Sequence, residues 1–268
     1  MSRDMVVRNP RTGRNDYSIQ SLDVTEVEQI TDNLRAAHSA WFEVGVEHRC
    51  KIVRAWADSL QEQPDAILEA LTADTGRHLV SLVEIRALNR IVSGWCAIAP
   101  GMLADGDERP SETNGVGVCS QFVPYELIGI ISPWNFPFLL SMLDAIPALI
   151  AGCSVIVKPS EVTPRFIKPL IRSLAAFPEL AGVFRWVEGD GETGAAIIDT
   201  VDAIAFTGSV ATGRIVAEGC AGNFIPAFLE LGGKDPAIVL PTADLEKAAR
   251  IILRASVQAT GQACQSLE

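Results

Sequence analysis

The segment LIGIISPWNFPFLLSMLDAIPALIAGCSVIVK, residues 127–158, decides the fold class of this chain. Its two ends, Leu127–Ile131 and Ser154–Val157, are short apolar runs rich in isoleucine and valine, and a longer apolar stretch, Phe138–Ile150, lies between them. Short runs that are apolar throughout are typical of parallel strands buried on both faces. The longer stretch predicts a buried helix that connects the two strands.

The same segment contains twenty mostly apolar residues in a row, Phe138–Val157, which is long enough to raise the question of a membrane span. Asp144 and Pro147 interrupt this stretch, and a break at Gly152 separates its helical part from the β-branched run. These interruptions favour a buried helix followed by a buried strand. We therefore expect no membrane partner.

The alternation of strand and helix continues towards the C-terminus. Further apolar runs and helical segments follow in turn: runs at 183–187, 203–206, 227–231 and 237–240, and helices at 165–176, 192–198, 211–220 and from Asp244. Strands separated by helices predict an α/β, doubly wound, Rossmann-like parallel sheet. In such a sheet, ligands bind beyond the carboxyl ends of the strands.

The residues before this segment predict helices. Apolar positions recur at helical spacing after a possible cap at Asp23 or Thr25, and the pattern returns at about 52–60, 64–76 and 79–99. Residues 101–117 are polar and rich in Gly, Pro, Asp and Glu, so we expect a loop or an exposed arm there.

Composition restricts the partners and the compartment. The chain of 268 residues carries 22 basic and 33 acidic side chains, a net charge of −11, with no basic run, which argues against nucleic acid as the main partner. The first eight residues lack the apolar stretch of a signal peptide. The six cysteines are far apart and form no CxxC pair, so we expect reduced thiols in a cytoplasmic protein.

Two turns that join a predicted strand to a helix could bind a phosphate. The first, Gly189-Asp190-Gly191-Glu192-Thr193-Gly194, matches the glycine-rich dinucleotide fingerprint. Its carboxylates would lie beside a dianion, so a turn without a ligand is an equally good interpretation. The second, residues 206–214, has small residues and no carboxylate, and Ser209 can cap its helix. A capped turn without a ligand remains the alternative here too.

Two further strand ends carry polar groups. Lys158 and Glu161 could hydrogen-bond the hydroxyls of a ribose, although spacing alone favours a solvated ion pair. The prolines at 133 and 137 restrict the backbone around Asn135, whose amide could face a developing oxyanion. A rigid turn with Trp134 packed on the core is the simpler interpretation.

Glu230 and Cys264 make chemical sense together. A thiolate nucleophile near a carboxylate that activates water suits two-step acyl chemistry. Each also has a structural interpretation, since a buried cysteine is usually a small apolar residue and a strand-end glutamate is usually solvated. The three histidines all lie before residue 79, so we expect neither a histidine-based triad nor a metal site.

Five of these motifs, in this order, resemble the NAD(P)-dependent aldehyde dehydrogenase superfamily: residues 133–137, 158–161, 206–213, 229–234 and 261–264. The resemblance covers the chain beyond about Pro124. It implies the oxidation of an aldehyde to a carboxylic acid with NAD, with NADP as a possible substitute. It also implies a small-molecule aldehyde as substrate and a homodimer or homotetramer.

The resemblance implies roles for particular residues. Cys264 would form a thiohemiacetal and then a thioester, Asn135 would hold the oxyanion and Glu230 would activate water. The cofactor would contact nine residues: Ile131, Trp134, Lys158, Glu161, Gly191, Gly208, Ser209, Gly213 and Leu231. In this assignment Ser209 and its neighbours meet the pyrophosphate, and Gly191 is at most a contact on the adenine side.

Family members are usually nearly twice as long, which implies an N-terminal fragment with a truncated catalytic domain. Residues 1–232 would be the cofactor-binding domain, interrupted by an oligomerisation hairpin at about 106–124, and residues 233–268 would begin the catalytic domain. Two alternatives stay open. A CoA-acylating aldehyde dehydrogenase would not need Glu230, and a non-catalytic nucleotide-binding remnant would not use Cys264.

Overall fold

The computed structural model describes residues 3–267 and is built around a five-stranded parallel sheet. The strand order is β7–β6–β5–β8–β9, so the chain starts in the middle of the sheet, winds to one edge and then returns to the other. β5 (Leu127–Ile131) pairs in parallel with both β6 (Ser154–Lys158) and β8 (Ala203–Gly208). This order confirms the doubly wound fold and places its topological switch point between β5 and β8.

The edge strands are β7 (Phe184–Trp186) and β9 (Ala227–Leu231). The helices are α1 (Val24–Glu43), α2 (Val46–Glu62), α3 (Asp65–Thr75), α4 (His78–Met102), α5 (Pro137–Ala151), α6 (Ile167–Leu174), α7 (Pro178–Val183), α8 (Gly191–Ile198), α9 (Val210–Gly222) and α10 (Leu245–Val257).

Helices cover both faces of the sheet, each with its own apolar cluster. The helices from α2 to α7 contribute to the cluster on one face, α8 and α9 contribute to the cluster on the other, and α1 contributes to both. Along β6 the side chains alternate between the clusters: Val155 and Val157 face the first, and Ile156 faces the second. The stretch Phe138–Val157 is therefore a buried helix and a buried strand, as predicted. No helix in residues 3–267 is long and apolar enough to cross a membrane.

The N-terminal region contains a hairpin that the sequence patterns did not predict. β1 (Arg3–Arg8) pairs antiparallel with β2 (Asn15–Ser21). Most of its side chains are exposed, and Val7 and Ile19 are its buried apolar residues, so it lacks the strong alternation that identifies a strand. The predicted helix after it is confirmed, since Asp23 and Glu26 form a capping box at the start of α1.

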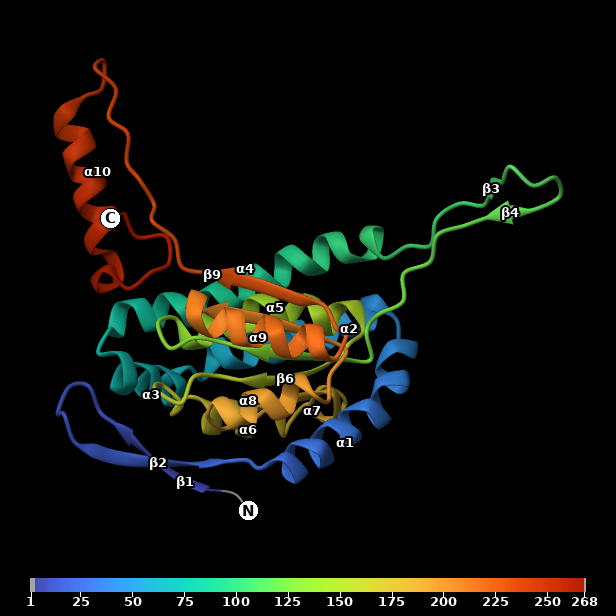
Figure 1. The fold of residues 1–268 in the computed structure, drawn as a ribbon, viewed down its shortest axis with the longest axis horizontal. Helices are drawn as coiled ribbons and strands as arrows, with labels where there is room; N and C mark the ends of the chain where they lie inside the picture. The colour runs from blue at the N-terminus through green and yellow to red at the C-terminus, as the bar shows by residue number, and fades with distance from the viewer. Residues whose placement is uncertain (1–2, 268) are drawn as a thin grey trace.

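A polar arm, residues 106–124, projects from the body (Figure 1). It contains the short antiparallel pair of β3 (Arg109–Pro110) and β4 (Gly117–Val118). Its apolar side chains Val118, Phe122 and Val123 are exposed, so within this chain the arm buries little of its own surface.

The C-terminal segment differs from the prediction. The apolar run Ala237–Leu240 is not a strand, and Ile238 is 84% exposed, because no strand within residues 3–267 pairs with it. α10 begins after Asp244, as predicted, but none of its residues is buried. Figure 1 shows α10 standing apart from the sheet and its covering helices.

Candidate active site

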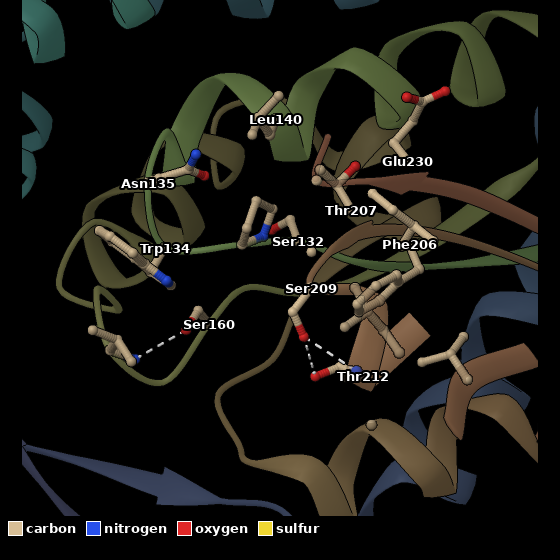
Figure 2. A pocket seen from close by; sticks show the side chains of 18 of the residues that line it. Ser132, Trp134, Asn135, Leu140, Ser160, Phe206, Thr207, Ser209, Thr212 and Glu230 are labelled. Atoms are coloured by element: carbon tan, nitrogen blue, oxygen red, sulfur yellow. Dashed lines mark hydrogen bonds between the residues drawn. The ribbon is translucent and has the colours of Figure 1, made fainter. Parts of the chain in front are cut away.

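A cavity of about 620 Å³ opens at the carboxyl ends of the strands. Its walls come from the β5–α5 loop, the loop after β6, the start of α8, the β8–α9 turn, the end of β9 and residues 261–264. Figure 2 shows Trp134, Asn135 and Ser160 on one side of this space and Ser209 with Thr212 on another. The cavity lies at the edge where a doubly wound sheet binds its ligands.

Asn135 joins two walls of the cavity. Its side-chain nitrogen Nδ2 donates to the backbone oxygen of Gln262 at 2.7 Å, and its side-chain oxygen accepts from the amide of Phe136 at 3.1 Å. These bonds fix the orientation of the amide and use one of its two N–H groups. Asn135 is thus tied to the segment that carries Cys264, although the two residues are 129 positions apart in the sequence.

Cys264 is exposed and follows a turn with an unusual backbone. Ala259, Thr260 and Gly261 are all left-handed, with φ of 51°, 62° and 72°. A left-handed backbone at a residue other than glycine costs of order 1 kcal/mol or more and persists only where its surroundings hold it. Contacts from other elements must therefore keep this turn in shape.

Glu230 comes from the edge strand β9, where its backbone lies opposite Thr207 of β8. Its side chain is exposed, lines the cavity and lies beside α5 in Figure 2. The charge of Glu230 acts on Asp144 of α5. Burial raises the pKa of the Asp144 carboxyl, and the charge of Glu230 raises this pKa further. Asn135, Glu230 and Cys264 thus reach one cavity from three separate elements.

The N-terminus of α9 faces the cavity with a neutral cap. The Ser209 hydroxyl accepts from the amide of Thr212 at 3.1 Å, and the two hydroxyls are 3.0 Å apart. The other first-turn amides have no acceptor within a helix, and they carry the positive end of its dipole. Ser209 and Thr212 line the cavity, as does Gly208 before them.

The N-terminus of α8 is occupied differently. The Asp190 carboxylate accepts from the amides of Glu192 and Thr193, at 3.0 and 3.5 Å, and it also pairs with Arg3. Burial acts to raise the pKa of Asp190, but these amides and the charge of Arg3 lower it by more. A carboxylate therefore already holds the place that an anion would take, and Gly191 lines the cavity beside it.

Lys158 is buried at the end of β6 and bridges two loops. Its Nζ donates to the backbone oxygens of Pro159 at 3.1 Å and Gly189 at 2.9 Å, and lies 3.5 Å from the Glu161 carboxylate. Burial lowers its pKa, and the charge of Glu161 opposes that shift. All three of its N–H groups have an acceptor within this chain, whereas the Glu161 side chain is 41% exposed at the cavity.

The predicted site residues come together with one exception. Apart from Gly213, all the predicted catalytic and cofactor-binding residues line the cavity, including Ile131 and Leu231. Gly213 is buried on the face of α9 that packs against β9, where an added Cβ would lie 2.6 Å from Leu231. Its role here is close packing of helix on strand.

Sequence reasoning missed Arg77. Its guanidinium donates to the backbone oxygens of Ala259, at 3.2 Å, and Asn135. In the sequence it is an arginine in a polar turn between two helices, with no local signal that distinguishes it from a solvated side chain. Residues 3–267 contain no group of three or more His, Cys, Asp or Glu side chains that could hold a metal ion.

The chain belongs to the aldehyde dehydrogenase family, whose sequence model matches residues 1–268. Geranial dehydrogenase from Castellaniella defragrans is 35% identical over 231 residues, 85% of this chain and 48% of that protein. The structure of PutA from Anabaena variabilis is similar with a TM-score of 0.96 and 48% identity, over 99% of this chain and 57% of that one.

An NAD-dependent benzaldehyde dehydrogenase from Corynebacterium glutamicum is similar with a TM-score of 0.91 and 29% identity, over 100% of this chain and 59% of that one. The chain spans about half the length of the curated relatives that it matches. The family predicted from the five motifs and the α/β fold predicted from the alternation of strands and helices are both confirmed.

Proposed function

We propose that the protein to which this chain belongs oxidises an aldehyde to a carboxylic acid, with NAD as the electron acceptor. The observation that carries this proposal is the single cavity lined by Asn135, Glu230 and Cys264 together with the N-terminus of α9. Thiol, amide and carboxylate are the groups that two-step acyl chemistry needs, and the helix terminus supplies an anion site beside them.

The proposed reaction begins at Cys264. Its sulfur attacks the aldehyde carbon, and the free N–H of Asn135, with the backbone amide of Cys264, stabilises the oxygen that becomes negative. NAD held by the α9 turn and Glu161 would supply the hydride acceptor for the oxidation of that carbon, and the acyl group would then remain on Cys264 as a thioester. Glu230 takes a proton from water, which attacks the thioester, releases the acid and frees the thiolate.

Two parts of the cavity suit NAD: the turn before α9, which can bind an anion, and the exposed carboxylate of Glu161. The turn that precedes α9 has a hydroxyl cap and no carboxylate, so it can accept a pyrophosphate, whereas Asp190 blocks the equivalent place on α8. Glu161 is the exposed carboxylate that would accept from the ribose hydroxyls, with Ile131 and Trp134 at the adenosine side. Lys158 would act by holding the loops around that ribose.

The mechanism is tested on the protein in the full length that its gene encodes. Cys264→Ala should abolish aldehyde-dependent NADH formation, because no sulfur remains to form the thiohemiacetal. Glu230→Gln should keep a single-turnover burst of NADH but slow steady-state turnover at least 100-fold, because only hydrolysis needs the base. The exposed Glu218→Gln on α9 serves as the matched control for the charge change at Glu230.

Loss of the burst in Glu230→Gln would contradict the assignment of this residue to the second step. Full turnover of that variant with coenzyme A, but none with water, would instead favour the CoA-acylating alternative. An active Cys264→Ala variant would overturn the proposed function.

Glu161 is proposed to set a preference for NAD over NADP, because its carboxylate would repel a 2′-phosphate. Glu161→Gln should lower the ratio of kcat/KM for NAD to kcat/KM for NADP at least fivefold. Relatives of both kinds exist, since a 34% identical protein of Mycolicibacterium smegmatis is named for NADP and the benzaldehyde dehydrogenase of Corynebacterium glutamicum is NAD-dependent. A wild-type protein that uses NADP clearly better would contradict this assignment.

We further propose that residues 1–232 form the cofactor-binding domain, that residues 233–268 begin the catalytic domain, and that the arm at residues 106–124 contacts another subunit of a homodimer or homotetramer. The exposed apolar side chains of the arm support the last point. We also propose a cytoplasmic location. Light scattering of the protein with and without residues 106–124 tests the role of the arm.

A further inference from the structure

One arginine outside the cavity touches both of the loops that carry the proposed chemistry. Arg77 lies between α3 and α4 and does not line the cavity. One terminal nitrogen donates to the backbone oxygen of Ala259 at 3.2 Å, and the other donates to the backbone oxygen of Asn135. These carbonyls belong to segments that are more than 120 residues apart, so a single guanidinium joins them.

The guanidinium is well held at this position. Its central carbon lies 5.2 Å from the centroid of the Phe136 ring, so the cation packs over an aromatic face. Burial lowers the pKa of Arg77, while the charge of Glu84 opposes the shift. Glu84 is itself 1% exposed and accepts from the amide of Leu139 at 3.1 Å, which fixes the start of α5 directly after Asn135.

The two loops depend on such support. Ala259 and Thr260 have the left-handed backbone that only surrounding contacts maintain, and Cys264 follows a few residues later. Beyond this turn, Asn135 Nδ2 reaches back to the oxygen of Gln262 at 2.7 Å. The contacts through Arg77 and Asn135 therefore link the same two segments at two points, which fixes both their distance and their relative orientation.

We propose that Arg77 is a positioning residue that keeps Asn135 and Cys264 in register, so that the Asn135 amide meets the oxygen of the substrate bound to Cys264. This inference rests on the proposed function for the chemistry, but its structural part concerns the two loops alone. The two terminal nitrogens of the guanidinium lie apart in one rigid plane, and each donates to a different carbonyl. A lysine ammonium donates from a single nitrogen, so it cannot keep the two carbonyls at that spacing.

The geometry predicts a separation of kinetic effects. Asn135 would stabilise charge that develops only as the thiohemiacetal forms, so its displacement should lower kcat. Cofactor binding uses the α9 turn and Glu161, which Arg77 does not touch, so the KM for NAD should change little. Misplacement of reacting groups by about 1 Å can cost about 100-fold in rate.

The experiment uses Arg77→Lys and Arg77→Ala in the protein as its gene encodes it, with the exposed Arg86→Lys on α4 as the matched control. We expect kcat to fall 10- to 100-fold in both Arg77 variants, with the KM for NAD within twofold of wild type. Added guanidinium ion at millimolar concentration should restore part of the rate in Arg77→Ala and have no such effect on Arg77→Lys. Thermal unfolding of each variant separates this effect from loss of the fold.

Hydrogen exchange provides a readout that needs no aldehyde turnover. In Arg77→Ala the amides of residues 134–136 and 259–264 should exchange faster than in wild type, with exchange in the central strands unchanged. Unchanged exchange in both segments, or unchanged kcat in Arg77→Lys, would overturn the proposal. If the wild-type protein has no aldehyde activity, but Arg77→Ala still shows faster exchange in both segments, the proposed function is refuted and the structural link between the two loops stands.

Discussion

α8 and α9 are two versions of the same local structure with opposite consequences. Each follows a parallel strand at the carboxyl edge of the sheet, each has a side-chain N-cap, and each has a glycine four residues after the cap. α8 carries the better match to the dinucleotide fingerprint. Its cap is the Asp190 carboxylate, however, whereas the cap of α9 is the Ser209 hydroxyl.

The difference teaches that a glycine pattern describes the backbone and leaves the charge at the helix terminus open. A helix N-terminus attracts anions through its unpaired amides and its dipole. Where a carboxylate of the chain already accepts from those amides, a phosphate would meet both a filled site and a like charge. The neutral cap of α9 leaves that position to a ligand.

The largest expected effect is on the affinity for NAD, and it comes from exchanging the carboxylate and hydroxyl caps of α8 and α9. Ser209→Asp keeps a good N-cap but places a carboxylate at the proposed pyrophosphate site, so NAD affinity should fall at least tenfold. Asp190→Ser should change the affinity less than threefold. Calorimetric titration of NAD into both variants and wild type measures this. A larger loss of NAD affinity in the Asp190 variant than in the Ser209 variant would contradict the placement of the pyrophosphate at α9.

The paired glycines allow a smaller and purely structural comparison. A Cβ at Gly194 would lie 3.6 Å from the Lys158 side chain, which is ordinary contact, whereas a Cβ at Gly213 would lie 2.6 Å from Leu231. Gly194→Ala should raise the free energy of unfolding by about 0.5–1 kcal/mol through helix propensity. Gly213→Ala should lower it by about 1 kcal/mol, since Leu231 must move. Denaturant unfolding of both variants provides the values, and equal changes would contradict this packing argument.

The smallest expected effect is a difference in pH dependence, because only one of the two caps titrates. The folded pKa of Asp190 lies below its ordinary 3.8, so its cap contributes stability above pH 4 that is lost as the pH falls through the lower folded value. Asp190→Ala should therefore cost about 1 kcal/mol near pH 7 and progressively less below pH 4, because it removes the cap together with its charge. Ser209→Ala should cost about as much at every pH. Thermal unfolding at pH 3 and pH 7 tests both, and a cost of the Asp190 variant that is constant with pH would be contrary to expectation.

A separate prediction concerns Glu84, which stabilises the start of α5. Burial raises its pKa from 4.5 to about 7, and the amides of Leu139 and Phe138 and the charge of Arg77 only partly oppose that shift. The folded state therefore holds this proton where the unfolded state has lost it, and stability should fall as the pH rises from 4.5 to 7. Glu84→Gln should reduce that loss. The unfolding midpoint of variant and wild type at pH 5 and pH 7.5 measures it, and identical slopes would contradict the burial argument.

The sequence by itself determined the features that depend on neighbours along the chain. Buried strands such as Leu127–Ile131, helices with one apolar face, and caps such as Asp23 and Ser209 follow from local periodicity and local hydrogen bonding. The order of five short motifs was enough to identify the family. These signals are local, so they survive without knowledge of what packs where.

Only the tertiary structure decided what depends on partners far along the chain. The β1–β2 hairpin has too few buried residues to leave a pattern. Ala237–Leu240 has the composition of a strand, but no strand in the described part of the chain pairs with it. Gly213 packs against β9, and Arg77 reaches two carbonyls that the sequence places 58 and 182 residues away. Such contacts cannot be predicted from the sequence, because every residue has the same backbone oxygen and the residue type does not show which oxygen accepts the bond.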